Sequence, residues 1–196
     1  MLETIQIRDG VPLHLAWHQE RMDRSVYEIY GQTNELILKE LVKVPGDLVK
    51  GVVKCRFIYG PGGWRTEYVP YSPRKIESLK LVEVTQLDYR FKYSDREELD
   101  FLSTQKGDCD EILMVIDDRV CDTSFSNIVF FNGTDWITPD SPLLEGTCRK
   151  RLIDSGRIGV SEIRPRDLEK FTHFRLINAM LDFDEQPMVE VSKIME

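Results

Sequence analysis

The chain has 196 residues, of which 41% are hydrophobic and 31% charged, so it can form one large or two small domains with a hydrophobic core. Its formal net charge of -8 argues against nucleic acid or an anionic membrane as the main partner, because both attract basic proteins. No stretch approaches the ~18 consecutive apolar residues of a membrane-spanning helix, and no secretory signal is expected. The four cysteines form no CxxC pair, which favours a reducing cytoplasm over a disulfide framework or zinc site.

The first half of the chain predicts a small α+β unit. Residues 2–8 have the pattern of a strand, and Asp9-Gly10 is a turn signal. Apolar residues at helical spacing predict a helix over 17–30, which Gly31 would end. Further elements are expected at 11–15 (strand), 34–43 (helix), 52–59 and 64–69 (a hairpin) and 79–85 (strand).

The second half predicts another α+β unit, connected to the first near residues 86–91. Asp95 with Glu98 three residues later resembles a capping box, which predicts a helix to about residue 105. The Asn-Gly pair at 132–133 predicts a hairpin turn. Helices are further expected at 146–155 and 166–171, and strands at 111–116, 119–121, 127–131, 136–138, 160–163, 174–177 and 188–191.

Three features could carry chemistry, and each also has an ordinary structural interpretation. Lys92 ends an alternating segment and could point inward, although most lysines are solvated surface charges. The small polar residues of 121–127 separate two strands, which indicates either a polar ligand or a local Asx or Ser/Thr turn. The helix start at 146–149 could bind phosphate, or Thr147 could simply cap it. No metal site is predicted, because no metal-ligand spacing connects the histidines, which are His14, His18 and His173.

Several short segments follow one another in the order typical of the fold-type IV pyridoxal-phosphate (PLP) enzymes. This family comprises the class IV aminotransferases and the 4-amino-4-deoxychorismate lyases, and the resemblance covers almost the whole chain. The segments are residues 2–5 (LETI, like FETI), 9–10 with 18–25 (like DG…HLxRLxxS), 110–113 (like DEALLLD), 119–128 (like xVTEGSxSNxF), 138–149 (like TPPL…ILPGITR) and 177–180 (closest to the CNAL variant of the lyases).

The resemblance implies a two-domain α/β fold of the D-amino-acid aminotransferase type. A small N-terminal α+β domain would comprise residues 1–88. A larger cofactor-binding domain with a β-barrel-like sheet would comprise residues 89–196. It also implies pyridoxal 5'-phosphate as cofactor, a small amino-acid-like substrate, and a homodimer, since the family places its active site near a subunit interface.

The resemblance also gives each matched position a role. Lys92 lies where the family has its Schiff-base lysine, which moves the proton at the substrate Cα. Asp122 replaces the glutamate that pairs with the pyridinium nitrogen, and it is one methylene shorter. Arg21 matches the arginine that clamps the phosphate. Further phosphate contacts are implied for Thr147, Cys148, Asn178 and Ala179, with the Cys148 thiol a weaker donor than the family's hydroxyl.

Two departures from the family pattern leave the substrate open. The family's N-terminal region is longer by about one hairpin, and that region lines the substrate side. The family's tyrosine near the cofactor's phenolic oxygen has no secure counterpart, and Tyr93 or Arg96 are the candidates to replace it. Thr4 lies where the lyases carry a threonine near the lysine.

Three functions agree with the sequence. The first is a lyase that converts 4-amino-4-deoxychorismate to 4-aminobenzoate and pyruvate for folate synthesis, as Thr4 and the segment 177–180 suggest. The second is a branched-chain or D-amino-acid aminotransferase, which needs the same lysine and a keto-acid acceptor. The third is a non-catalytic PLP-binding protein that has kept the fold, for which the shorter N-terminus and Asp122 leave room.

Overall fold

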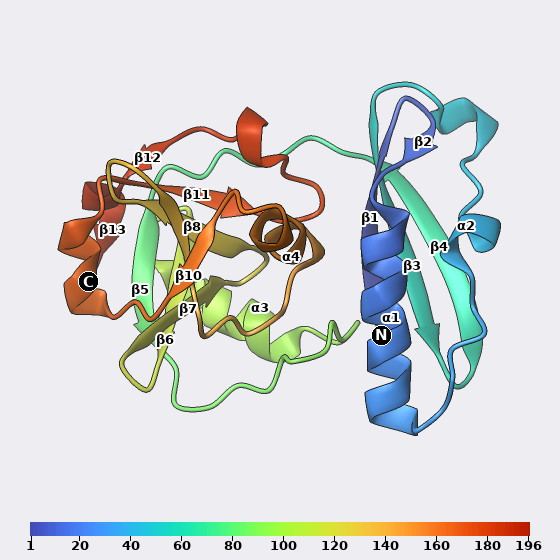
Figure 1. The fold of residues 1–196 in the computed structure, drawn as a ribbon, viewed down its shortest axis with the longest axis horizontal. Helices are drawn as coiled ribbons and strands as arrows, with labels where there is room; N and C mark the ends of the chain where they lie inside the picture. Colours follow the sequence, from blue (N-terminus) through green and yellow to red (C-terminus); the bar gives the residue numbers. More distant parts are fainter. The chain divides into compact units, whose positions relative to one another are not determined.

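The computed structural model describes all 196 residues, and the chain divides into two compact units. The first unit comprises residues 1–73 and 91–94, and the second comprises residues 74–90 and 95–196. Strands dominate both units and helices are few, which confirms the predicted mixed α/β class (Figure 1). The predicted cofactor-binding domain over 89–196 stays a prediction. No helix in the chain is long and apolar enough to span a lipid bilayer.

The first unit is one antiparallel sheet with the order β2-β1-β3-β4. The pairing of β3 with β4 is the hairpin that alternating apolar residues on both sides of a glycine-rich turn predict. The expected strand at 11–15 has only two residues, because a helix begins at Leu15 directly after His14, whose φ is 55°. The strands are β1 (Leu2–Arg8), β2 (Val11–Pro12), β3 (Val52–Gly60) and β4 (Gly63–Pro70).

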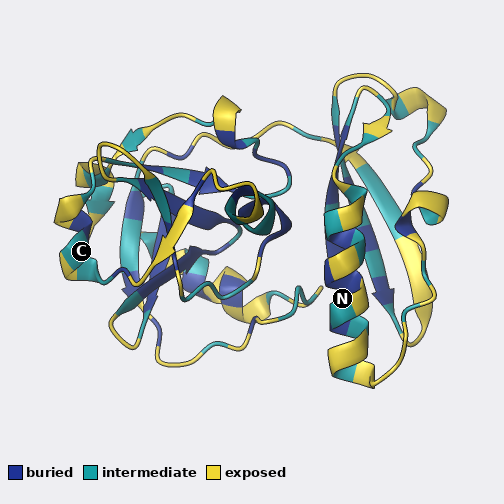
Figure 2. Cartoon of the chain, in the orientation of Figure 1, coloured by how far each residue is buried: buried dark blue, intermediate teal, exposed yellow.

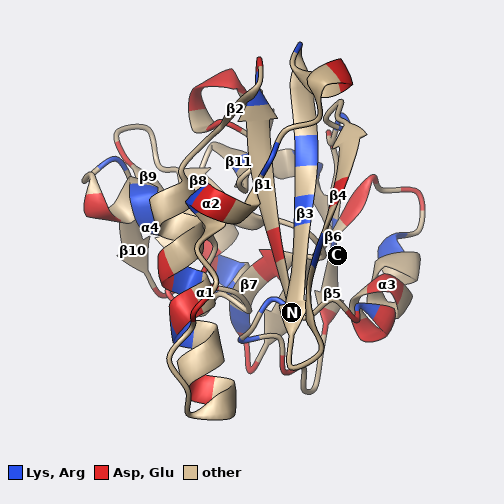
Figure 3. Ribbon diagram, turned by 90° about the vertical axis from the view of Figure 1, so that its right-hand side faces the viewer, with Lys and Arg blue, Asp and Glu red and all other residues tan.

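Helix α1 (Leu15–Tyr30) buries one side against this sheet, as the alternation of dark and light bands in Figure 2 shows. Its Met22 belongs to a fully buried cluster with Ile5 and Phe57, and burying each such side chain contributes ~1.5–3 kcal/mol. Both acidic and basic residues occur along the remainder of the helix (Figure 3). Gly31 ends α1 with a φ of 64°, as expected.

The expected second helix over 34–43 is a single turn, α2 (Leu38–Leu41), followed by the 3-10 turn η1 (Gly46–Leu48). Asn34 explains the difference, because its side-chain oxygen accepts a hydrogen bond from Leu36 N at 3.1 Å. This local turn competes with helix formation at the position where the helix would begin.

The second unit contains two sheets, with the orders β13-β5-β6-β7 and β10-β9-β8-β11-β12. A core cluster that includes Leu79, Leu113, Phe130 and Phe174 takes side chains from both of them. The strands are β5 (Leu79–Glu83), β6 (Glu111–Ile116), β7 (Arg119–Thr123), β8 (Asn127–Phe131), β9 (Trp136–Pro139), β10 (Gly159–Ser161), β11 (His173–Ile177), β12 (Val189–Glu190) and β13 (Ile194–Met195).

The structure does not confirm the predicted β-barrel-like sheet, because both sheets of the second unit are open. The chain passes from one sheet to the other between β7 and β8. There Thr123 N donates to Ser126 O at 3.0 Å, so the connecting residues close a local turn and do not extend a ladder. The edge strands β10, β12 and β13 have two or three residues each, while the remaining edge strand, β7, has five.

The helices of the second unit are short. Helix α3 (Glu97–Ser103) continues into the 3-10 turn η2 (Thr104–Lys106), within one residue or two of the expected bounds. The expected capping box is wrong, because Asp95 accepts from Glu97 N at 3.0 Å and no side chain caps the helix at Arg96. The others are α4 (Thr147–Asp154), η3 (Pro165–Lys170), η4 (Phe183–Glu185) and η5 (Val191–Lys193).

Candidate active site

Asp122 lies near the end of β7 and is almost completely buried, with 5% of its surface exposed. Its Oδ1 accepts a hydrogen bond from Asn127 Nδ2 at 2.9 Å. Its Oδ2 accepts from the backbone N–H groups of Leu143 and Leu144 at 2.9 and 3.1 Å. Burial raises the pKa of Asp122 to about 6, although these hydrogen bonds and the charge of Arg149 favour the ionised form. The second unit therefore holds a carboxyl group that can ionise near neutral pH.

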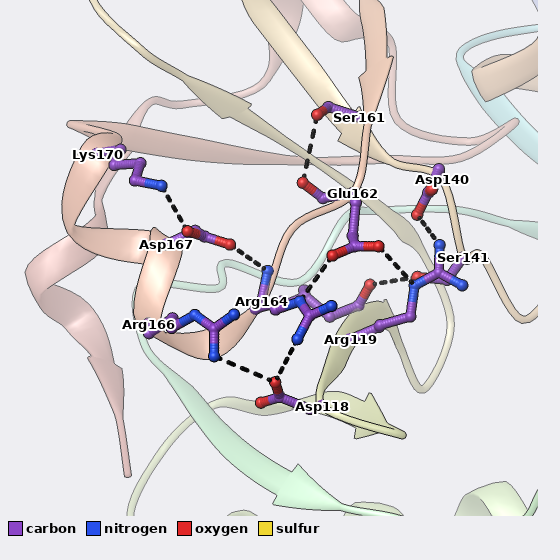
Figure 4. Close-up of polar contacts among 11 residues, drawn as sticks. Asp118, Arg119, Asp140, Ser141, Ser161, Glu162, Arg164, Arg166, Asp167 and Lys170 are labelled. Carbon is purple, nitrogen blue, oxygen red and sulfur yellow. Dashed lines mark hydrogen bonds and ion pairs between the residues drawn. The ribbon is translucent and has the colours of Figure 1, made fainter.

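The loop that supplies the two N–H groups is anchored next to the start of β7 (Figure 4). Arg119 Nη2 donates to Asp140 Oδ1 at 2.6 Å, and Ser141 Oγ donates to Val120 O at 3.0 Å. These contacts connect residues 140–141 to the strand that carries Asp122. The anchored loop thus supplies N–H donors whose direction is fixed before any ligand binds.

The polar segment after Asp122 forms the Ser/Thr turn that was one of its two sequence interpretations. Thr123 Oγ1 accepts from Ser126 N and donates to Ser126 O, both at 3.0 Å. Two predicted site residues also hold this turn. Arg96 Nη2 donates to Ser124 O at 2.8 Å, and Asn178 Nδ2 donates to Ser126 Oγ at 2.8 Å. The turn interpretation does not exclude a ligand, because the turn lies directly beside the buried carboxyl group.

The predicted phosphate site at the start of α4 differs in detail from the family pattern. Gly146 is the N-cap and no side chain caps the helix, so Thr147 is not the cap. Cys148 belongs to a core cluster with Leu152 and Ile177, and burial raises the pKa of its thiol. The thiol therefore packs inward, and the backbone N–H of residue 148 is the group that can serve the predicted phosphate contact.

Asn178 and Ala179 follow β11 in a tight loop. Asn178 Oδ1 accepts from Met180 N at 2.8 Å, so both ends of this side chain make hydrogen bonds within the second unit. Ala179 is half-buried. The structure thus gives Asn178 a clear role in holding the turn at 123–126, and the predicted phosphate contacts of both residues stay predictions.

The first unit contains a buried charge cluster around Glu3, which sequence reasoning missed. Glu3 is fully buried, and its carboxylate accepts from Arg21 Nε at 2.9 Å and Arg21 Nη2 at 2.5 Å. His18 Nδ1 lies 2.6 Å from Glu3 Oε2. Burial alone would raise the pKa of Glu3, but Arg21 and His18 lower it to about 2. Glu3 is therefore a permanently ionised group at neutral pH.

Lys92 and Thr4 lie around this cluster. The backbone oxygen of Lys92 accepts from Leu2 N at 2.9 Å, which places Lys92 at the strand that carries Glu3. Burial lowers the pKa of His18, and the positive charges of Arg21 and Lys92 lower it further. Thr4 is half-buried on β1, opposite Arg56 of β3. The structure thus brings Arg21 and Lys92 into one electrostatic neighbourhood.

The predicted site residues belong to both units. Arg21, Lys92 and Thr4 are part of the first unit, while Arg96, Asp122, Thr147, Cys148, Asn178 and Ala179 are part of the second. That the two groups form one site stays a prediction. Asn127 and Glu3 were missed, although they lie within the segments 119–128 and 2–5 that carry the family resemblance.

Comparison with known proteins identifies the class. Residues 96–194 match the model of the family "Amino-transferase class IV", so Lys92 lies four positions before the matched region. A crystal structure from Haemophilus somnus named "putative 4-amino-4-deoxychorismate lyase" has 34% identity and a TM-score of 0.86, and the match covers 92% of this chain and 95% of that one. The chain belongs to the class IV aminotransferase family, whose members are PLP-dependent enzymes.

Two further relatives extend this assignment. An uncharacterised protein of Haemophilus influenzae is 34% identical over 92% of this chain and 97% of its own length. A "probable branched-chain-amino-acid aminotransferase" of Thermotoga maritima is 25% identical over 99% of this chain and 83% of its own length. The family is thus certain, and the names of the relatives divide between two reactions.

The residues present fit PLP. The Asp122 carboxylate has about four acceptor positions, of which Asn127, Leu143 and Leu144 occupy three. A protonated ring nitrogen could take the fourth, and its positive charge would favour the ionised form of a carboxyl group whose pKa is raised by burial. Arg149, which acts on Asp122 through its charge, is itself bound to Pro139 O at 2.8 Å.

Proposed function

We propose that the chain is a PLP-dependent lyase that acts on 4-amino-4-deoxychorismate and releases 4-aminobenzoate and pyruvate. The observation that supports this most is the Haemophilus somnus structure of that name, which matches at 34% identity over almost the full length of both chains. The sequence of residues 177–180, closest to the lyase variant of that segment, supports the same choice. A role in folate synthesis follows from the product.

In this proposal Lys92 binds the cofactor covalently and carries the proton at the substrate Cα. Bound PLP supplies an electron sink that accepts the charge released when that proton leaves. The cluster of Glu3, His18 and Arg21 acts on Lys92 through its charges. Because His18 has a lowered pKa and is neutral at pH 7, it adds no positive charge that would oppose a protonated Lys92.

In this proposal Asp122 binds the ring nitrogen of the cofactor and Arg21 binds its phosphate. The Asp122 carboxylate keeps the ring nitrogen protonated, and the cation in turn favours the ionised form of Asp122. Glu3 binds the Nε–Nη2 edge of Arg21 and so orients the guanidinium that would contact the phosphate. The backbone N–H groups at the start of α4 complete the phosphate contacts.

An aminotransferase is the alternative, and the Thermotoga maritima relative at 25% identity favours it. It would use Lys92 and Asp122 in the same way, but it needs a second half-reaction with a keto acid. A non-catalytic PLP-binding protein is the third possibility and would keep the cofactor without turnover. One set of measurements separates the three.

The test begins with borohydride reduction of the protein incubated with PLP, followed by mass spectrometry of its peptides. We expect the cofactor on the peptide that contains Lys92, and no adduct in Lys92→Ala, whereas the exposed control Lys193→Ala keeps it. Pyruvate release from 4-amino-4-deoxychorismate without a keto acid supports the lyase. Turnover of amino acids only with an acceptor supports the aminotransferase, and a bound cofactor without either activity supports the third function.

We also propose that the protein acts as a cytoplasmic homodimer, as the family's active-site position at a subunit interface implies. Light scattering of the purified protein tests the oligomeric state. A monomeric mass at concentrations where the enzyme is active would contradict this part of the proposal.

A further inference from the structure

We propose that Asn127 is a positioning residue that orients the Asp122 carboxylate, and that glycine is required at position 146 because the Asn127 side chain occupies the space of a Cβ atom there. The inference rests on the proposed function, because it assigns a purpose to the buried carboxyl group that would bind the ring nitrogen. It concerns residues of the second unit alone, so their geometry can be measured in the protein without cofactor.

The hydrogen bonds of Asn127 support this role. Its Nδ2 donates to Asp122 Oδ1 and to Leu144 O, both at 2.9 Å, and 5% of its surface is exposed. Because both donor hydrogens are used, the amide can rotate only by giving up a hydrogen bond of a buried group. Asn127 is also fixed by the sheet, where it begins β8 and pairs with Ile177. The amide therefore connects a strand, the acid and the loop that follows β9.

Gly146 supplies independent geometric support. A Cβ atom at this position would lie 2.0 Å from Asn127 Oδ1 and 3.2 Å from its Cγ. The backbone of Gly146 is extended, with φ −65° and ψ 140°, so any residue could adopt its conformation. The glycine is therefore required by the close approach of the Asn127 side chain and not by the backbone angles.

The charges around Asp122 show why such a residue is needed. Burial raises the pKa of Asp122, and the largest opposing effect is the hydrogen bond from Asn127. Two other charged or titratable groups interact electrostatically with Asp122. One is Arg149 of α4, and the other is Cys121, which precedes Asp122 in the chain and whose own pKa is raised by burial.

The experiment compares Asn127→Ala, Gly146→Ala and the double variant, with Gly159→Ala as the matched control. In the Gly159→Ala control the new Cβ atom would lie 3.9 Å from Trp136 O and 4.0 Å from Ile137 Cγ1, which are ordinary van der Waals distances. The first measurement is the pKa of Asp122 in the protein without PLP, from carboxyl NMR chemical shifts. The second is the PLP dissociation constant as a function of pH.

We expect Asn127→Ala to raise the pKa of Asp122 by about one unit, because a hydrogen bond to the charged form is lost. Gly146→Ala should raise it similarly, since the methyl group displaces the amide. The double variant should equal Asn127→Ala alone, because the two changes act through one side chain. PLP affinity should fall about tenfold in all three, as is typical when a supporting hydrogen bond is removed.

Two outcomes would overturn the inference. One is an unchanged Asp122 pKa in both single variants, and the other is a double variant whose pKa shift is the sum of the single shifts. If PLP does not bind the wild type at all, the proposed function fails, and the pKa measurements still decide the role of Asn127. A further outcome is that Asp122→Asn weakens PLP binding while Asn127→Ala changes neither the pKa of Asp122 nor the PLP dissociation constant. In that case the proposed function is supported and the inference about Asn127 fails.

Discussion

Each unit of the molecule contains a buried carboxyl group with a strongly shifted pKa, and the two pKa shifts have opposite directions. Glu3 has a guanidinium and an imidazole as neighbours, and its pKa is lowered to about 2. Asp122 accepts hydrogen bonds only from an amide and two backbone N–H groups, and its pKa is raised to about 6. Equal burial thus gives opposite shifts, and the charge of the hydrogen-bond donors decides which one occurs.

The opposite pKa shifts also distinguish the roles of the two acids, because Glu3 has a structural role and Asp122 is suited to bind a ligand. Glu3 is already neutralised by Arg21, so it serves to hold a cation in place. Asp122 carries an ionisation cost that a bound cation would relieve, which is typical of groups at functional sites. Four measurements test this difference between the two acids.

The largest effect is expected for Glu3→Gln, which leaves the Arg21 guanidinium buried without its ion-pair partner. Removing one partner of a buried ion pair costs about 3–5 kcal/mol. Urea unfolding at pH 7 measures the loss. The matched control is Glu67→Gln, whose ion pair with Arg56 is 37–40% exposed and should contribute less than about 1 kcal/mol. A loss for Glu3→Gln no larger than that of the control would contradict the assigned ion cluster.

The two acids should also give opposite dependences of stability on pH. Asp122 binds its proton more tightly when folded, so stability decreases as pH rises from about 4 through about 6, by about 3 kcal/mol in total. Glu3 has a lowered pKa, so its contribution is complete above about 4.5 and is lost as pH falls through about 2. Unfolding free energies between about pH 2 and pH 8 test both dependences, and Asp122→Asn should remove the decrease above pH 4. A slope that persists in this variant would show that another group causes it.

A smaller loss is expected for His18→Ala. The change removes one of the donors to Glu3 but leaves Arg21 in place, so about 1–3 kcal/mol of stability should be lost. Because the pKa of His18 is lowered, this loss should be constant from pH 7 to pH 8, where the imidazole is neutral. Urea unfolding at these two pH values measures it. A loss equal to that of Glu3→Gln would show that His18, not Arg21, is the main partner of the carboxylate.

The smallest effect is expected in the surface network of Figure 4, although it contains many charges. The pair of Arg119 and Asp140 has side chains that are 36% and 33% exposed, so Asp140→Asn should cost less than about 1 kcal/mol. Chemical unfolding measures the cost, and carboxyl NMR of the same variant follows Asp122. A cost of several kcal/mol, or a clear change in the pKa of Asp122, would show that the ion pair controls the loop at 140–146.

Much of the fold follows from local patterns in the sequence. The strand at 52–60 is predictable because apolar residues alternate along it, and the helix at 15–30 because they recur at helical spacing. The strand at 111–116 is a short continuous apolar run. The family is predictable because its motifs occur in order over nearly the whole chain. The helix expected at 34–43 shows the limit of such patterns, since one asparagine side chain diverts the backbone at its start.

The class of enzyme could be predicted from the sequence because its motifs resemble those of a known family in the same order, and the same resemblance implies the candidate residues. Only the tertiary structure decided how these residues are used. Glu3 meets Arg21 across 18 positions, Asn127 fits against Gly146, and the Cys148 thiol points into the core. Such contacts arise when separate elements pack together, and the pKa of a buried acid depends on that packing more than on its neighbours in the chain.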